Sequence, residues 1–424
     1  MNKVLIVTYY WPPSGGAGVQ RWLKFSKYLP DFGWDPIILT VDSEFAAYPV
    51  TDFSLEADLS SSVKIYSTPA INYFRIYKKD KSKIPTAGFA NSVDNSFKGK
   101  ILRFIRGNFF LPDPRKGWNK YAFKKACQLI ETEGIRNIIT TSPPHSTQLI
   151  GLKIKKKYPA LNWIADLRDP WTDIYYYKQF YPTFISRWID LRYEKNVLRN
   201  ADKIITVGDS LKNLFSMKVM GVESKTEVIT NGFDEDDFSG SRADNPARFT
   251  VTYVGTLSDI YPIEGFLNAL KIFKEKGNEF MLRFIGTVSG YQKDLIQSKT
   301  GNSILEFIPY VDHSEAIKYM LQTTALLLII PDHQSRKSIL TGKLFEYLAS
   351  GKPIICIGPV DGDAAVIISN TGHGITFSYN DSKGISEYLS SLISDNSISE
   401  KMSPGSFSRR ELTKRIIPLF SNFN

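Results

Sequence analysis

Lys343 and Glu346 form the residue pair in this sequence whose types and spacing most directly indicate chemistry. They lie in the stretch SILTGKLFEYLASGKPII, residues 338–355, where a loop opens a helix near Gly342. Side chains at this spacing share one face of a helix. A lysine and free amide groups at a helix N-terminus suit a diphosphate, and a carboxylate one turn further on suits the paired hydroxyl groups of a ribose. The alternative is a salt pair on the protein surface.

A second candidate is the glycine-rich loop SGGAG, residues 14–18, which follows an expected strand and precedes an expected helix. Gly15 and Gly16 allow backbone amide groups to approach an anion. The loop is not a Walker loop, because no Lys-Ser/Thr pair follows it. It also fails the dinucleotide-binding pattern, because Arg21 stands where that pattern has glycine. The loop is therefore either an anion site or a plain turn.

A third candidate is the segment DLRDPW, residues 166–171, at the carboxyl end of an expected strand. Open α/β sheets bind ligands at that end. Asp166, Arg168 and Asp169 crowd two carboxylates and a guanidinium together, either as a functional cluster or as a structural ion-pair cluster. His145 also follows a strand and could face a ligand, although a single loop histidine is more often incidental.

No metal site is expected from the sequence. The four histidines, His145, His313, His333 and His373, lack metal-ligand spacing. The Asp-Gly-Asp stretch at 361–363 resembles a metal-binding pair, but its place in a loop after a strand favours a turn.

Short apolar runs alternate with amphipathic stretches along the whole chain, and this alternation predicts the elements that carry these candidates. Runs that are apolar on both faces and separated by helices indicate parallel sheets covered by helices on both sides. The expected strands span 3–10, 135–142, 161–167, 203–208, 249–255, 281–286, 304–311, 325–331 and 352–358. The expected helices between them include 19–29, 147–158 and 209–219.

Length and composition set the broad class of protein. At 424 residues, 42% apolar and 23% charged, the chain is expected to be an ordinary globular protein of two or three domains. Cys127 and Cys356 are expected to be buried free thiols, as in a reducing compartment. The first apolar run is too short for a signal peptide, and none is long enough to span a bilayer. We therefore expect a cytoplasmic protein, with any membrane contact peripheral, on the inner face of the cell membrane.

Basic residues concentrate in residues 71–125, which hold 14 Lys or Arg against 3 Asp and no Glu. This excess is larger than the net charge of +10 of the whole chain, so it indicates a local partner surface. Phe97 to Phe109 read as a helix with one apolar and one basic face. Such a helix suits either an anionic membrane surface or a domain helix with a solvated basic face. RNA is disfavoured, because no RNA-binding module is present.

Taken in order, these segments resemble glycosyltransferase family 4. The resemblance rests on YYWPPSGGAGVQRWLKFSKYL, VITNGFDEDDF, VTYVGTLSDIYPIEGFLNAL and TGKLFEYLASGKPII, and it covers nearly the whole chain. Within the family the chain is most similar to amino-sugar transferases of surface-polysaccharide synthesis, which carry an Arg-Asp-x-Trp segment. The resemblance implies an α/β protein with two Rossmann-like, doubly wound parallel-sheet domains facing across a cleft, the fold called GT-B.

The resemblance also implies domain roles. An acceptor-side domain would span residues 1–208, with 404–424 packing back on it. A nucleotide-sugar domain would span 209–403. The implied activity is a retaining, metal-independent hexosyl transfer without a cofactor, from a UDP- or GDP-linked sugar to a glycan or polyprenyl-linked acceptor in the synthesis of cell-surface polysaccharide or lipopolysaccharide.

The resemblance assigns residues to the donor as well. Glu346 would hold the ribose, and Gly342 and Lys343 would bind the diphosphate. Gly255 and Thr256 would form the loop that faces the phosphates. Gly15 and Gly16 would line the cleft from the acceptor side. Asp169 and Arg168 would take the catalytic region. Two positions depart from the family pattern, because Ser338 replaces a glutamate that contacts the donor sugar and Thr256 replaces an arginine. The alternatives are a nucleotide-sugar epimerase of the same fold and a non-catalytic relative that binds nucleotide or glycan.

Overall fold

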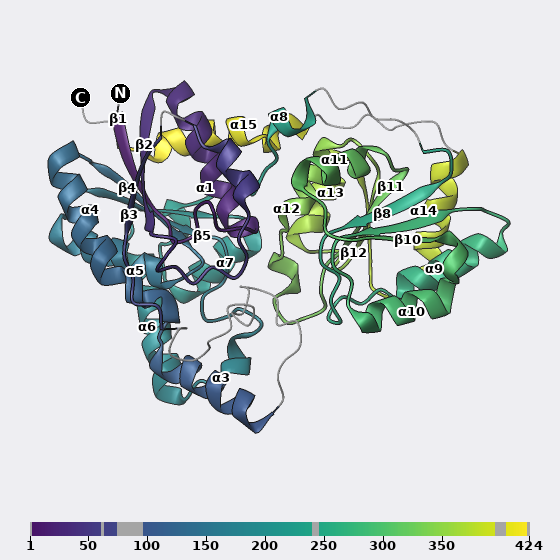
Figure 1. Cartoon of the computed structure of the whole chain (residues 1–424), viewed down its shortest axis with the longest axis horizontal. Coiled ribbons are helices and arrows are strands. Elements are labelled where there is room, and N and C mark those ends of the chain that lie inside the picture. The colour runs from purple at the N-terminus through teal and green to yellow at the C-terminus, as the bar shows by residue number, and fades with distance from the viewer. Residues whose placement is uncertain (1, 61–62, 74–95, 240–245, 395–403, 422–424) are drawn as a thin grey trace. The chain divides into compact units, whose positions relative to one another are not determined.

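A computed structural model describes the chain at residues 2–60, 63–73, 96–239, 246–394 and 404–421. The chain divides into two compact units, which are treated separately below (Figure 1). The first unit comprises residues 1–230 and 409–424, and the second comprises residues 231–408.

The first unit is built on a seven-stranded sheet in the order β3-β2-β1-β4-β5-β6-β7, and every neighbouring pair is parallel. Its strands are β1 (Asn2–Val7), β2 (Trp34–Val41), β3 (Lys64–Thr68), β4 (Asn137–Ser142), β5 (Asn162–Leu167), β6 (Lys203–Thr206) and β7 (Thr226–Val228). Its α-helices are α1 (Ala17–Tyr28), α3 (Phe97–Phe109), α4 (Asn119–Glu133), α5 (Ser146–Lys157), α6 (Phe184–Asn200), α7 (Asp209–Lys218) and α15 (Arg409–Ile416). Parallel strands need crossover connections, which these helices provide.

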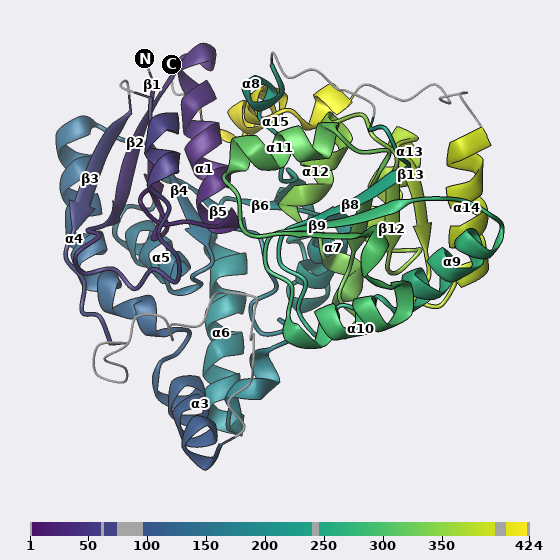
Figure 2. The same ribbon diagram turned by 45° about the vertical axis from the view of Figure 1, so that its right-hand side comes forward.

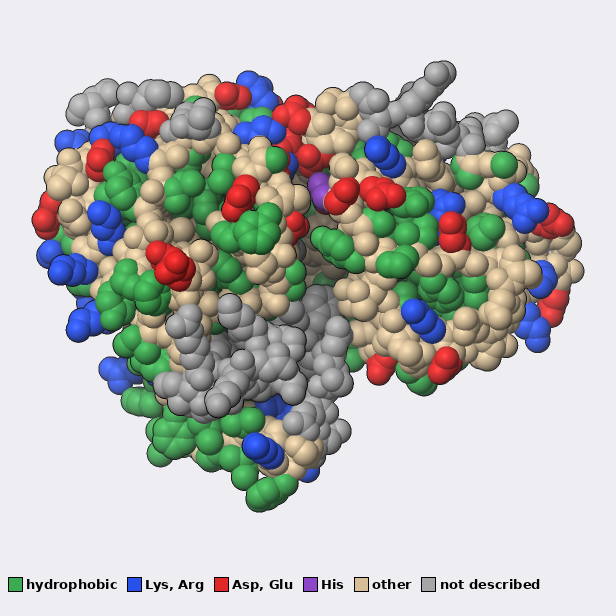
Figure 3. Space-filling view, viewed as in Figure 1, with side chains coloured by type: hydrophobic (Ala, Val, Ile, Leu, Met, Phe, Trp, Pro, Cys, Tyr) green, Lys and Arg blue, Asp and Glu red, His purple; other side chains and the backbone are tan. Residues whose placement is uncertain are grey.

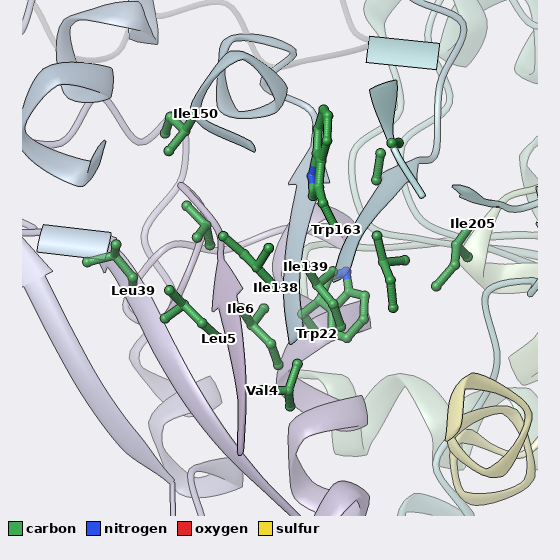
Figure 4. Close-up of a cluster of buried hydrophobic side chains, with 14 of the residues drawn as sticks. Val4, Leu5, Ile6, Trp22, Leu39, Ile138, Ile139, Ile150, Trp163 and Ile205 are labelled. Carbon is green, nitrogen blue, oxygen red and sulfur yellow. The ribbon is translucent and has the colours of Figure 1, made fainter. Parts of the chain in front are cut away.

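The core of the first unit surrounds its central strands. Val4 to Val7 of β1 are fully buried, as a strand covered on both faces requires. Figure 4 shows their side chains close to those of β4, together with Trp22 from α1 and Ile150 from α5. Because each such large apolar side chain contributes roughly 1.5–3 kcal/mol on burial, this cluster holds the strand ends in place.

The second unit is built on a six-stranded parallel sheet in the order β10-β9-β8-β11-β12-β13. Its strands are β8 (Thr250–Val254), β9 (Met281–Ile285), β10 (Leu305–Ile308), β11 (Ala325–Ile329), β12 (Ile354–Ile357) and β13 (Gly374–Phe377). Its α-helices are α8 (Glu235–Phe238), α9 (Glu264–Glu275), α10 (Gly290–Thr300), α11 (His313–Leu321), α12 (Gly342–Ala349), α13 (Asp363–Thr371) and α14 (Ser382–Ser394).

Alternating side chains of the second sheet enter two separate core clusters. In β11, Leu327 and Ile329 join a cluster with α9, α10 and α14, whereas Leu326 and Leu328 join a cluster with α11, α12 and α13. This alternation is the period of a strand buried on both faces. Figure 2 shows α9, α10 and α14 together on one side of the sheet. The prediction of two Rossmann-like, doubly wound domains is confirmed.

The first unit extends beyond the boundary expected at residue 208. Strand β7 pairs with β6, where Val228 lies opposite Thr206, so residues 209–230 complete the first sheet. At the other end, residues 409–424 belong to the first unit, and α15 lies beside α1 (Figures 1 and 2). The expected divisions at 208 and 403 are therefore replaced by divisions at 230 and 408.

Both cysteines, Cys127 and Cys356, are buried and free, as expected. Within the described ranges, no helix is both long enough and apolar enough to cross a membrane. Within the same ranges, no group of three or more His, Cys, Asp and Glu side chains is placed to hold a metal ion.

Candidate functional site

The second unit places its candidate residues where its strand order reverses. From β8 the chain adds β9 and β10 on one side, and then β11, β12 and β13 on the other. Ligands of open α/β sheets bind at the carboxyl ends of the strands beside such a switch point. Gly255 and Thr256 directly follow β8, and α12 begins after the loop that follows β11. The two segments named by the sequence therefore meet at the switch point of one sheet.

Lys343, in the first turn of α12, is held against the end of β8. Its Nζ donates a hydrogen bond to the hydroxyl of buried Tyr253 at 3.1 Å and lies 4.4 Å from the centre of that ring. Burial lowers the pKa of Lys343 to about 8, although the Glu346 carboxylate partly opposes this. A cation kept half-buried at a helix N-terminus is a poor arrangement for the isolated protein, and an anionic ligand would improve it.

Gly255 makes room for this lysine. Its φ of +115° is unfavourable for other residues, and a Cβ there would lie 2.8 Å from Lys343 Nζ. Gly342 has open space where its Cβ would lie. The N-cap residue of α12, Thr341, makes no side-chain capping hydrogen bond. The first amide groups of α12 are therefore left without a side-chain cap beside the Lys343 ammonium group.

Glu346, one turn along α12, is the centre of a short polar relay. Its Oε1 lies 3.0 Å from His313 Nε2, and His313 Nδ1 lies 3.9 Å from Asp237 Oδ2. All three side chains are partly exposed. The relay joins α8, α11 and α12 and fixes one carboxylate oxygen of Glu346. A carboxylate oriented in this way can accept hydrogen bonds from paired hydroxyl groups.

The two positions that depart from the family pattern lie in different surroundings. Thr256 is half-buried, and its carbonyl oxygen accepts the Tyr253 hydroxyl at 2.7 Å. Ser338 ends a short 3₁₀-helix (Arg336–Ser338), and its hydroxyl donates to the Ser335 carbonyl at 3.0 Å. The Ser338 hydroxyl is thus used within its own turn.

The first unit has its switch point between β1 and β4. Gly16, after β1, is the N-cap of α1, with a φ of +91° and open space where its Cβ would lie. Gly15 is used differently, because its amide donates to the Val50 carbonyl at 2.9 Å and its Cβ would lie 3.0 Å from Asp52 Cβ. Only Gly16 of this pair is therefore placed to offer its surface to a ligand.

Asp166 is the centre of a buried structural network. It forms a salt bridge with Arg21 at 3.2 Å, and both side chains have no exposed surface. Trp22 and Thr141 each donate to Asp166 at 2.7 Å. Arg21 also donates to the carbonyl groups of Ile229 and Thr230, both at 2.8 Å. The arginine that breaks the dinucleotide pattern thus ties α1 to β5 and to the end of the first unit, and for Asp166 the ion-pair interpretation is correct.

Arg168 bridges the switch point of the first sheet. Its Nε donates to the Ser142 carbonyl at 2.9 Å, and its Nη1 donates to the Gly18 carbonyl at 3.1 Å. Its Nη2 is buried and makes no hydrogen bond in the described part of the chain. A buried guanidinium nitrogen without a partner costs free energy, so this nitrogen is a candidate contact for a bound ligand.

His145 lies at the end of β4 with its ring stacked on Trp171, at 4.9 Å between centres and 11° between planes. Both ring nitrogens are buried, and neither has a hydrogen-bond partner among the residues that the structure describes. Burial lowers the pKa of His145 to about 4, so the ring is neutral at pH 7. Asp169, on the neighbouring loop, is half-buried, and desolvation raises the pKa of its carboxyl group.

Sequence reasoning did not assign to the site two residues that contact Lys343 and Glu346 in the second unit, and it left the role of His145 in the first unit open. Tyr253 and His313 contact Lys343 and Glu346 from distant parts of the chain, so no local spacing marks them. His145 had a usable signal, because it directly follows an expected strand, but the Trp171 ring that buries it comes from another loop.

The second unit matches a known protein family. Residues 234–409 match the family described as glycosyl transferases group 1. The matched region includes β8, the Lys343 site and the Glu346 relay, and it supports glycosyl transfer as the activity. No curated protein matches the chain in sequence.

Solved structures of similar architecture cover nearly the whole chain. Sucrose-phosphate synthase from Thermosynechococcus elongatus is 14% identical, with a TM-score of 0.60 over 99% of this chain and 96% of its own. The Anabaena protein HepE in complex with UDP is 12% identical, with a TM-score of 0.62 over 99% of both chains. A UDP-N-acetylglucosamine 2-epimerase from Listeria monocytogenes, described as putative, is 8% identical, with a TM-score of 0.55 over 98% of this chain and 94% of its own. At these identities the likeness shows the fold, which is that of GT-B proteins.

Proposed function

We propose that this protein is a retaining glycosyltransferase that moves a hexose from a nucleotide-sugar donor to a glycan or polyprenyl-linked acceptor. The observation that carries the proposal is the Lys343 ammonium group, half-buried beside Gly255 at the open N-terminus of α12. An anion would offset the charge of this half-buried ammonium group, and the diphosphate of a nucleotide sugar has the right charge. The family match of residues 234–409 supports this reading.

The second unit would stabilise the departing diphosphate. When the bond between sugar C1 and the diphosphate oxygen breaks, negative charge grows on that oxygen. Lys343 and the first amide groups of α12 would offset this charge, and a single such donor is commonly worth about 3 kcal/mol. Glu346, oriented by His313, would hold the ribose hydroxyl groups. No metal is assigned a role in this scheme.

The first unit would supply the acceptor side. The acceptor hydroxyl forms the new bond to C1 and loses its proton. Arg168 Nη2 and the His145 nitrogens, which are buried without a partner in the described residues, would orient that acceptor, and Asp169 is a second candidate to take the proton. Gly16 would line the same side.

The donor base is proposed to be uracil or guanine, with UDP favoured because the similar Anabaena structure contains it. The pathway is proposed to be the synthesis of cell-surface polysaccharide or lipopolysaccharide, from the resemblance to amino-sugar transferases.

A nucleotide-sugar screen by thermal shift tests the proposal, because a ligand that binds only the folded state raises the melting temperature. The sugar nucleotide found is then assayed for donor consumption with and without a glycan acceptor. A transferase consumes the donor faster when acceptor is added. An epimerase instead converts the donor sugar without releasing the nucleoside diphosphate, and a non-catalytic relative binds the donor without turnover.

A further inference from the structure

Helix α3 turns its apolar side to solvent. Phe97, Ile101 and Phe104 lie on one side of the helix and are exposed, Phe97 to 80%. The opposite side contains Gly107, which is buried so closely that a Cβ there would come within 2.3 Å of the Phe180 carbonyl oxygen. An amphipathic helix of a soluble domain normally turns its apolar side to the core. The solvated basic face expected as one alternative is present only in part, and the apolar side does not pack against the core.

Two arginines of α3 face the protein and fix this orientation. The guanidinium group of Arg106 lies 4.0 Å from the centre of the Phe180 ring, and that of Arg103 lies 5.7 Å from the centre of the Tyr181 ring. Asn108 Oδ1 accepts a hydrogen bond of 2.8 Å from the amide of Thr183, the N-cap residue of α6. Helix α3 therefore sits firmly on the start of α6, with its phenylalanines outward.

Helix α6 shows the same arrangement in its first turns. Phe184, Ile185 and Trp188 are exposed, to 83%, 67% and 53%. The two acidic residues of the helix, Asp190 and Glu194, are buried to within 1%. Both α3 and α6 thus expose large apolar side chains to water, and α6 keeps its two carboxylates buried.

The buried carboxylates are fully engaged in the protein. Asp190 accepts hydrogen bonds of 3.0 Å from Trp171 and from Tyr177. Glu194 pairs with Lys218 at 2.6 Å. Their negative charge is therefore screened from the surface that α3 and α6 expose.

The charges left on that surface are all positive. Residues 96–112 and 174–189 contain no Asp or Glu. They contribute the exposed side chains of Lys98, Lys100, Lys178 and Arg187. Figure 3 shows apolar side chains gathered with Lys and Arg side chains at the lower end of the view, over α3. A second copy of this chain would bring like charges together on contact, whereas an anionic surface would complement them.

We propose that this surface docks on an anionic lipid bilayer. We name it the α3–α6 face, and it consists of Phe97, Ile101, Phe104, Phe109, Tyr181, Phe184, Ile185 and Trp188 with the basic residues around them. Aromatic and aliphatic side chains enter the boundary between headgroups and acyl chains, and Lys and Arg contact lipid phosphates. The α3–α6 face shares only α3 with the basic segment 71–125, because α6 comes later in the chain. Residues 74–95 of the basic segment lie outside the described ranges. The proposal is independent of glycosyl transfer.

Vesicle flotation of the full chain tests this docking. We expect the protein to float with vesicles that contain phosphatidylglycerol and to remain unbound with phosphatidylcholine alone. Replacing Lys98, Lys100 and Arg187 together by glutamine should weaken binding about a hundredfold, because each basic residue near the surface contributes about fivefold. The combined replacement of Phe97, Phe184 and Trp188 by serine should weaken it at least about tenfold.

A matched control removes three exposed lysines from the second unit instead. The variant Lys271→Gln, Lys274→Gln, Lys276→Gln carries the same charge change and should float like the unmodified chain. Melting temperatures identify any variant that fails to fold. If the triple serine variant fails to fold, the single variants Phe184→Ser and Trp188→Ser are tested in its place. Equal binding to neutral vesicles, or full binding by the serine variants, would overturn the proposal. So would a dimer of the unmodified chain that the serine variants abolish without any vesicle binding.

Discussion

The two units differ in how they hold the candidate functional groups at their strand ends. In the second unit, Lys343 is anchored to Tyr253, and Glu346 is anchored to His313. In the first unit, the nitrogens of His145 and one nitrogen of Arg168 are buried without a partner in the described residues. The second unit thus has a site whose cation and carboxylate are already oriented. The first has buried groups that a ligand would complete.

This difference is consistent with the division of labour that we propose. Charge that is oriented before the reaction stabilises a leaving group without reorganisation, which suits a diphosphate site in the second unit. Buried groups that lack partners cost free energy until a ligand satisfies them, which suits acceptor recognition in the first unit. If first-unit variants weakened donor binding, or second-unit variants changed only the use of the acceptor, this comparison would be wrong.

The largest effect is expected from Lys343→Ala. Removing the ammonium group should lower kcat/KM for the donor by about a hundredfold to a thousandfold, as loss of a single charge-stabilising donor does. Steady-state kinetics with the donor found in the screen measure this effect. Lys318→Ala removes an exposed lysine from α11 and should leave the rate unchanged. Equal rates in both variants would place the diphosphate elsewhere.

His145→Ala tests the first unit in the same assay. We expect turnover to fall about a hundredfold, because the neutral ring can orient the acceptor or take its proton. Donor affinity should not change, since His145 belongs to the other unit. Asp169→Asn, measured beside it, shows which of the two groups serves the acceptor. Full turnover in the histidine variant would return His145 to a purely structural role.

The pH dependence sharpens the assignment of Lys343. Its pKa is lowered to about 8, so the ammonium form dominates below that pH and is lost above it. In the unmodified chain, kcat/KM should therefore fall about tenfold per unit above pH 8. Lys343→Arg keeps its charge at these pH values and should abolish this decline. Persistence of the same decline in the arginine variant would assign it to another group.

The smallest effects are expected in the ribose relay. Glu346→Ala should weaken nucleotide binding about tenfold, and His313→Ala about threefold, because the histidine acts through the carboxylate. A double variant that is no weaker than Glu346→Ala would confirm that His313 works through Glu346. Additive losses would contradict the relay.

Local sequence patterns predicted most strands and helices, but they predicted fewer of the contacts between the site residues. The N-terminus of α12 was predictable because Lys343 and Glu346 depend on spacing within one helix. Strand β2 was not identified, because Pro36 interrupts its apolar run and a proline argues against a paired strand. Strands β7 and β13 each bury a single residue, so neither contains the apolar run that marked the other strands.

The missing parts of the site depend on tertiary structure. His313 meets Glu346 across 33 residues of chain. The role of Asp166 depends on Arg21, which is 145 residues away. No window of sequence contains either pair, so only the assembled sheet distinguishes the structural carboxylate from one that faces a ligand.

Calorimetric titration of UDP and GDP into the unmodified chain and into Lys343→Ala tests the central claim most directly. The account predicts that one of the two nucleotides binds the unmodified chain, and that the alanine variant binds it at least about tenfold more weakly. Equal affinity in both proteins, or no binding of either nucleotide to the unmodified chain, would contradict a diphosphate site at the N-terminus of α12.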